Sequence, residues 1–164
     1  MKTYYPLALN NEWHYQQKDG STYTNKVTAA NGDEYTMHNS AANTTSIVRK
    51  SGDLIETDAL EKGIFQPWLP ADLEAGKKWT IPFKANGLDC LLLMTVKETG
   101  ISKEVSGKMY NDVIFIEAEN QIIMNGTQMA LNFFTQYYYA DGIGLILTTS
   151  SAGDVHALTD YKLN

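Results

Sequence analysis

Short runs of alternating polar and apolar residues, separated by turn dipeptides, extend along most of the chain. Side chains of a strand alternate between the two faces of a sheet, so this pattern is typical of strands with one buried face. The sequence predicts strands over residues 12–18, 22–29, 33–38, 45–50, 53–57, 78–84, 90–98, 101–106, 112–120, 121–124, 127–139, 144–149 and 155–162.

The turn dipeptides between these runs favour hairpin connections. Asn-Gly and Asp-Gly tolerate the positive φ that two-residue hairpin turns require. Such turn signals stand at Asp19-Gly20, Asn31-Gly32, Ser51-Gly52, Asn86-Gly87, Asn125-Gly126, Asp141-Gly142 and Ala152-Gly153. Many short strands with this punctuation indicate an antiparallel sheet, barrel or sandwich.

The segment 57–76, TDALEKGIFQPWLPADLEAG, interrupts the strand pattern. Residues 58–62 suffice for one helical turn, but Gly63, Pro67 and Pro70 break any helix that begins there. We expect a loop with a short helix that crosses one end of the sheet.

Length and charge narrow the class of protein. The chain has 164 residues, which predicts one domain over 1–164. Its formal charge is −6 and it has a single arginine, Arg49. Nucleic-acid binding needs clustered Lys and Arg to neutralise phosphates, so we expect no nucleic-acid partner. No run approaches the roughly 18 apolar residues of a membrane helix, so we expect a soluble protein without a transmembrane segment.

The first residues, MKTYYPLALNNEW, give little indication of compartment. Their apolar stretch is too short and too polar for the core of a signal peptide. The chain as given is therefore expected in the cytoplasm, or in the periplasm or outside the cell if a native signal was removed. The single cysteine, Cys90, lies in the apolar run DCLLLM and reads as a small buried hydrophobe.

Both ends of the chain carry a recognisable pattern. The opening YYPLALNNEWHYQ resembles the "PL..GN.W.Y" start of a group of uncharacterised bacterial β domains, many of them secreted or attached as lipoproteins. GKMYNDVIFIEAE, YYYADGIGLIL and HALTDY resemble the group's closing segments, "YYA.G.GL" and "L..Y". The chain differs at Asn10, where the group has Gly. The resemblance implies an all-β fold, a single antiparallel, strongly curved sheet or half-open barrel, and it implies no activity.

The tyrosines of YYYADGIGLIL allow two interpretations. Tyr137 and Tyr139 share one face of a strand and Tyr138 lies on the other. One interpretation is a packing wall of the core. The other is a wall of a concave binding surface, where tyrosine offers apolar area with a polar tip.

No catalytic or metal motif stands out. His14, His38 and His156 lack metal-ligand spacing, and Cys90 is near none of them. Glu117 and Glu119 share a strand face, but the carboxylates of a glycosidase must flank the bond from opposite sides. No nucleophile elbow or phosphate loop occurs. We expect no enzyme activity, no catalytic residue, no metal site and no cofactor.

The charge distribution supplies a candidate surface. Residues 109–161 contain no lysine or arginine but several acidic residues, namely Asp112, Glu117, Glu119, Asp141, Asp154 and Asp160. On neighbouring strands these would form an acidic face that attracts cationic partners, unless they only serve solubility. The predicted binding residues are Asp112, Glu117, Glu119, Tyr137, Tyr139 and Asp141.

Two functions fit these observations. The first is a non-catalytic bacterial domain that binds a protein or a small apolar ligand through a concave, tyrosine-rich acidic face. The alternative is an immunity or inhibitor protein that neutralises a basic toxin or effector by direct binding. A ligand binder should have a cavity, whereas an inhibitor should have a filled core and an exposed acidic patch.

Overall fold

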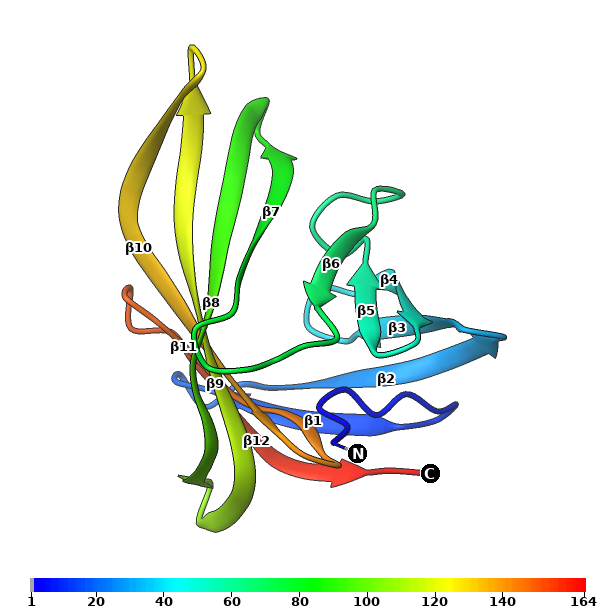
Figure 1. The fold of residues 1–164 in the computed structure, drawn as a ribbon. Helices are drawn as coiled ribbons and strands as arrows, with labels where there is room; N and C mark the ends of the chain where they lie inside the picture. Colours follow the sequence, from blue (N-terminus) through cyan, green and yellow to red (C-terminus); the bar gives the residue numbers. More distant parts are fainter. Residues whose placement is uncertain (1) are drawn as a thin grey trace.

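The computed structural model describes residues 2–164 and confirms an all-β fold built on one strongly curved antiparallel sheet (Figure 1). Strands that follow one another in sequence are paired in the sheet, except β6 and β7, because hairpin turns connect most of them. The strands are β1 (Glu12–Gln17), β2 (Thr22–Asn31), β3 (Glu34–Asn39), β4 (Thr44–Ser51), β5 (Leu54–Thr57), β6 (Gln66–Leu69), β7 (Lys78–Ala85), β8 (Leu88–Val105), β9 (Lys108–Met124), β10 (Thr127–Ala140), β11 (Gly144–Ser150) and β12 (Val155–Lys162).

The sheet consists of two six-stranded halves joined by the first and last strands. The strand order is β6-β5-β4-β3-β2-β1-β12-β11-β10-β9-β8-β7. Figure 1 shows β2 to β6 on one side of the molecule and the upper parts of β7 to β10 on the other. The pairing of β1 with β12 links the halves, so the sheet curves into a nearly closed barrel with β6 and β7 as its edges.

The predicted strands match the observed ones closely, with three differences. The ranges 90–98 and 101–106 form one strand, β8, and 112–120 and 121–124 form one strand, β9. Register shifts in the β8–β9 pairing between Val96 and Lys103 absorb the irregular positions of β8, so this strand continues through them, and β9 pairs with β8 without a shift across residues 120 and 121. Within 57–76 the chain forms loops and the short strand β6, which the pattern does not predict, and no helix.

Side chains bridge the two sheet edges. The Gln66 side-chain amide on β6 donates to the Pro82 carbonyl on β7 at 2.8 Å, and the Trp79 indole N–H donates to the Pro67 carbonyl at 3.1 Å. Pro67 and Pro82 have no N–H for a ladder, which suits edge positions. The seam between β6 and β7 is therefore held by side chains instead of a backbone ladder.

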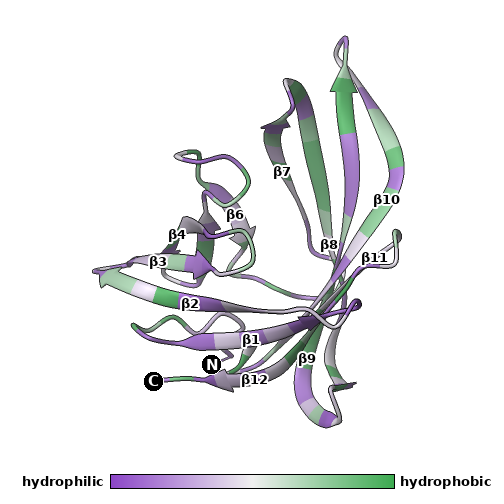
Figure 2. Cartoon of the chain, turned by 180° about the vertical axis from the view of Figure 1, so that it is seen from behind, coloured by the Kyte–Doolittle hydropathy of each residue, from purple (hydrophilic) through white to green (hydrophobic). Residues whose placement is uncertain are grey.

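The pairing of β9 with β10 determines which face is buried. Tyr137 lies opposite Ile116, and Tyr139 lies opposite Ile114; both isoleucines have 0% exposure. Opposite residues in an antiparallel pair lie on the same face, so these tyrosines face the interior. Figure 2 shows apolar segments continuing along β8 and up to the free end of β9.

The backbone conformation of residue 10 explains why asparagine can stand where the resembling group of β domains has glycine. Its backbone φ is 69, in the left-handed region that glycine and asparagine adopt more easily than other residues. In this conformation the Asn10 N–H donates to the Val27 carbonyl at 2.9 Å.

The turn after the three tyrosines packs directly against the first strand. Gly142 has φ 77 and Gly144 has φ 111, and the Trp13 indole N–H donates to the Ile143 carbonyl at 2.6 Å. A Cβ atom on Gly144 would lie 3.1 Å from Trp13 Nε1, whereas one on Gly142 would meet nothing within 4 Å. Gly144 is therefore required both by its backbone angle and by the indole above it.

We predict that Gly144→Ala destabilises the protein more than Gly142→Ala. Both changes place a side chain at positive φ, which costs about 1–2 kcal/mol. Only Gly144→Ala adds a clash with the Trp13 ring, for a further cost of roughly 1–3 kcal/mol. Urea unfolding measures both free energies. Equal destabilisation by the two variants would contradict the packing of Trp13 on this turn.

Candidate functional site

A cleft of about 690 Å³ opens between the two halves of the sheet. We call it the amide cleft, because three asparagines, Asn25, Asn39 and Asn43, line it. Its floor is buried and its mouth is exposed. The remaining lining residues are Tyr5, Met37, Thr44, Thr45, Ser46, Thr57, Asp58, Ala59, Leu60, Lys62, Trp68, Tyr139 and Leu145.

Aromatic side chains from both halves form the floor of the amide cleft. The Trp68 indole N–H on β6 donates to the Tyr139 hydroxyl oxygen on β10 at 2.7 Å. The Tyr137 ring meets Trp68 edge to face, with ring centroids 5.3 Å apart and an interplanar angle of 78°. The indole is thus fixed by a hydrogen bond and by an aromatic contact of a favoured geometry.

Two asparagines on neighbouring strands form a fixed amide pair. Asn25 on β2 lies directly opposite Asn39 on β3, and the Asn39 amide nitrogen donates to the Asn25 Oδ1 at 2.9 Å. The Asn39 Oδ1 accepts from the backbone N–H groups of Ala41 and Ala42 at 2.9 and 3.1 Å. These bonds orient both amides before any ligand arrives.

The loop after β5 closes one wall of the cleft. Asp58 has only 7% exposure, and its two carboxylate oxygens accept from the backbone N–H groups of Ile47 at 2.7 Å and Gly63 at 3.1 Å. The Thr57 hydroxyl donates to the Ile47 carbonyl at 3.1 Å. Asp58 therefore serves to hold the loop.

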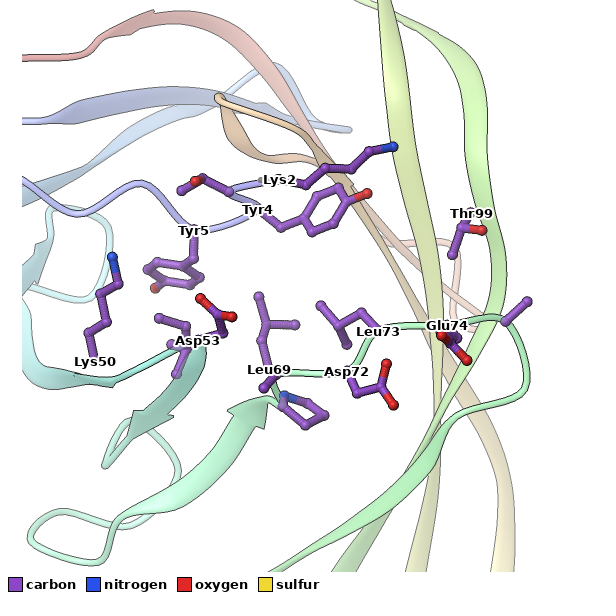
Figure 3. A pocket seen from close by; sticks show the side chains of 15 residues that line it. Lys2, Tyr4, Tyr5, Lys50, Asp53, Leu69, Asp72, Leu73, Glu74 and Thr99 are labelled. Atoms are coloured by element: carbon purple, nitrogen blue, oxygen red, sulfur yellow. The ribbon is translucent and has the colours of Figure 1, made fainter.

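Tyr5 separates the amide cleft from a second cavity. That cavity has a volume of about 430 Å³ and we call it the charged pocket, after Lys2, Lys50, Asp53, Asp72 and Glu74 in its lining. Figure 3 shows the Tyr5 ring between Lys50 and Leu69. The Tyr5 ring also packs on Tyr139 at a centroid distance of 6.3 Å, so it is shared by both cavities.

The tyrosines of the floor are held in their neutral form. Burial raises the pKa of Tyr5 and of Tyr137 to about 12, and it raises the pKa of Tyr139 well above its usual 10.0. The cause is the cost of placing a phenolate charge in an apolar interior. At neutral pH these hydroxyl groups are therefore available as hydrogen-bond donors.

The structure separates the six predicted binding residues into three groups. Tyr137 and Tyr139 face the interior, where Tyr139 has 2% exposure and lines the cleft. Tyr137 supports Trp68 from behind and is not among the lining residues. Both tyrosines thus pack in the core, and Tyr139 also lines the cleft.

Glu117 and Glu119 lie on the opposite face of the sheet. They lie opposite Gln136 and Phe134 on β10, and they alternate with the buried Ile116 and Ala118. Their carboxylates are engaged, since Glu117 accepts from the Gln136 side chain at 3.1 Å and Glu119 accepts from Gln121 at 2.6 Å. The acidic and tyrosine-rich residues therefore do not share one concave face, because strand alternation directs them to opposite sides.

Asp112 and Asp141 come together at one end of the sheet, where they hold the first residues of the chain. Lys2 pairs with the Asp112 carboxylate at 3.2 Å, and the Thr3 N–H donates to the Asp141 Oδ1 at 2.6 Å. The Gly142 N–H donates to the Thr3 carbonyl at 2.8 Å. These two aspartates position the segment that carries Tyr5.

Sequence reasoning missed most residues of the cleft. Asn25, Asn39, Trp68 and Tyr5 belong to three strands and a loop that are far apart in sequence. A signal exists for the amide pair, since Asn25 lies in the predicted strand 22–29 and Asn39 directly follows its predicted hairpin partner, 33–38. Counting back from the Asn31–Glu34 pair would place Asn25 opposite Ser40, and only the bulge between Val27 and Ala29 brings Asn39 into register.

In residues 2–164, no group of three or more His, Cys, Asp or Glu side chains is placed to hold a metal ion. Residues 2–164 also contain no helix that is long and apolar enough to cross a membrane.

Comparison with known proteins identifies the fold. The structure resembles a presumed exported protein with a YmcC-like fold from Bacteroides fragilis, with a TM-score of 0.62 and 11% identity over 99% of this chain and 100% of the other. It also resembles a presumed lipoprotein from Parabacteroides distasonis, with a TM-score of 0.55 and 9% identity over 98% and 99% of the two chains. No family model and no curated protein matches the sequence. The chain therefore shares the fold of these bacterial β proteins.

We predict that Tyr139→Phe lowers the free energy of unfolding by about 1–3 kcal/mol, because it removes the acceptor of the half-buried Trp68 N–H at the buried Tyr139 position. Tyr138→Phe is the matched control. Tyr138 lies on the opposite face and stacks on Phe115 at 4.7 Å, a contact that phenylalanine retains. Its effect should stay within about 0.5 kcal/mol. Urea unfolding measures the free energy of unfolding of both variants. An unchanged free energy for Tyr139→Phe would contradict the hydrogen bond between Trp68 and Tyr139 in the floor of the cleft.

We also predict a loss of stability at alkaline pH. Because the pKa of Tyr5 and of Tyr137 is about 12 when folded and 10.0 ordinarily, the folded chain keeps protons that the unfolded chain releases. This stabilisation is complete below pH 10.0 and is lost as pH rises toward 12. Tyrosinate absorbance, followed together with circular dichroism, should show a late group of tyrosines that ionise as the fold is lost. Complete ionisation near pH 10.0 with the fold intact would refute it.

Proposed function

We propose that the chain is a non-catalytic binding domain that holds a small ligand in the amide cleft. The observation that carries this proposal is the cleft itself, whose volume of about 690 Å³ lies within the roughly 300–1,000 Å³ typical of small-molecule sites. Its floor combines fixed aromatic rings with a few oriented polar groups, which is the usual composition of such sites.

The construction of the cleft supports a binding role over a purely structural one. A packed core has few voids larger than a water molecule. Here, Trp68 and Tyr139 are fixed by mutual contacts, and Asn25 and Asn39 by theirs, around a space that remains open. Groups that are oriented in advance lose less entropy when a ligand binds.

The alternative function, neutralisation of a basic toxin through an acidic face, receives less support. It needs several unpaired carboxylates on one surface. Glu117 and Glu119 are bonded to glutamine side chains, and Asp112 and Asp141 hold residues 2 and 3 of the same chain. We therefore place the ligand site in the cleft and not on the acidic strands.

A location outside the cytoplasm accords with this function. Both solved structures of the same fold are described as an exported protein or a lipoprotein. We infer that this domain works in a bacterial envelope or outside the cell, where it would meet ligands of the surroundings or of the envelope.

The proposal predicts a small-molecule adduct that depends on Trp68. The purified full chain, incubated with a small-molecule extract of bacterial envelopes, should show an adduct by native mass spectrometry. Trp68→Ala removes the central ring of the floor, and loss of such an anchor should weaken adduct retention at least tenfold, since buried aromatic anchors contribute about 2 kcal/mol or more.

Tyr138→Ala is the matched control, because it removes an aromatic ring from the opposite face. It should leave adduct retention unchanged. An adduct that survives Trp68→Ala, or the absence of any adduct on the original chain, would contradict the proposed function.

A further inference from the structure

We propose that the ligand of the amide cleft is neutral and rich in hydroxyl groups, a saccharide rather than an acyl chain. This inference rests on the proposed binding function and specifies its ligand class. Three properties of the cleft carry it: its oriented amides and hydroxyls, its aromatic floor, and the engagement of its buried carboxylate.

The amides offer donors and acceptors together. A hydroxyl group of a ligand both donates and accepts, and an asparagine amide has two donors and an acceptor oxygen. Asn39 uses one acceptor position of Asn25, which leaves the two N–H donors of Asn25 in the lining of the cleft. Because Asn39 is itself fixed by the N–H groups of Ala41 and Ala42, the Asn25 amide is held in one orientation.

Hydroxyl groups continue this surface toward the mouth. Thr44 and Ser46, at the start of β4, lie opposite Asn39 and Met37 and share their face, and both line the cleft. Asn43 precedes them with a positive φ of 50, and its Oδ1 lies 3.1 Å from His38 Nε2. The wall thus presents neutral polar groups from Asn43, Thr44 and Ser46 to the cleft.

The floor suits the face of a sugar ring. The Trp68 indole is anchored through its N–H to the Tyr139 oxygen, and the edge-to-face contact with Tyr137 stabilises its orientation. Aromatic faces carry a partial negative charge, which attracts the polarised C–H groups of a saccharide ring. The Tyr139 hydroxyl accepts from Trp68 and still has its own proton to donate to a ligand.

Charge in the cleft does not favour an ionic ligand. Asp58 is the carboxylate of the lining, and both of its oxygens accept backbone N–H groups, from Ile47 and Gly63. Lys62, the one lysine of the lining, is exposed at the mouth. An acyl chain would fit poorly for a different reason, since covering amides and hydroxyls with hydrocarbon costs roughly 1–3 kcal/mol for each polar group left without a partner.

The test compares two classes of probe on the full chain. The saccharide probes are maltohexaose, cellohexaose and mannohexaose, and the apolar probe is dansyl-undecanoic acid. We expect at least one oligosaccharide to change tryptophan fluorescence on binding. Asn25→Leu removes the amide and keeps a side chain of similar size. It should weaken oligosaccharide binding tenfold or more, because a ligand hydroxyl group that bonds to Asn25 would be left without a partner in the site.

Asn111→Leu is the matched control, since Asn111 is exposed on β9 and lies outside the cleft. The Asn111→Leu variant should bind the oligosaccharide as tightly as the unsubstituted protein does. Circular dichroism and urea midpoints verify folding. If Asn25→Leu does not fold, Thr44→Val replaces it, because Thr44 lies opposite Asn39 and lines the cleft, and it should weaken binding severalfold.

The two proposals fail separately. Binding of dansyl-undecanoic acid that Trp68→Ala abolishes and Asn25→Leu preserves, with no oligosaccharide bound, would overturn the saccharide inference and leave the binding function standing. Failure of every probe would also overturn the inference, while the envelope-extract adduct measurement decides the binding function independently.

Discussion

The pairing of β1 with β12 is the constraint on which the rest of the structure depends. It joins two six-stranded halves that share no other ladder within residues 2–164, and it brings residues from the two ends of the chain into register, such as Trp13 with Tyr161. The interior repeats this link, because Tyr15 donates to the Leu145 carbonyl at 2.7 Å and Trp13 donates to that of Ile143 at 2.6 Å. This pairing therefore brings Asn25 of one half and Tyr139 of the other to the same cleft.

The open edges of the sheet, β6 and β7, are a second feature that determines how the two halves lie. A closed twelve-stranded ladder would fix the distance between β6 and β7, whereas here side chains of Gln66 and Trp79 bridge these edges. Trp68 lies on β6, beside this seam, and is bonded across the interior to Tyr139. The floor of the cleft is thus also a link between the two halves of the sheet.

Most strands of this fold were predictable because they follow from local sequence patterns. Alternation and turn dipeptides locate nearly all strands, since hairpins are determined by residues close in sequence. β6 escapes because it has four residues, includes Pro67 and has no alternation long enough to detect. The long strand β8 looks interrupted in sequence because register shifts between Val96 and Lys103, which the pairing with β9 tolerates, break the period of two.

The candidate site was less predictable, for a reason that alternation itself explains. The pattern shows that Tyr137 and Tyr139 share a face and that Glu117 and Glu119 share a face, but not whether the two faces are the same. The register of β9 against β10 decides this, and it places them on opposite sides. The amide pair depends on a one-residue bulge near Thr28, and the role of Tyr5 depends on contacts between residues 2 and 3 and the distant Asp112 and Asp141.

The central claim is that the ligand occupies the amide cleft, and side-chain NMR tests it most directly. Proton–nitrogen correlation spectra resolve asparagine and glutamine NH₂ groups and indole N–H groups. On titration of the full chain with maltohexaose, cellohexaose and mannohexaose, we expect the resonances of Asn25, Asn39 and Trp68 to shift together, while those of Gln121 and Gln136 on the opposite face stay in place. Shifts confined to Gln121 and Gln136, or unchanged resonances in the cleft, would contradict the account.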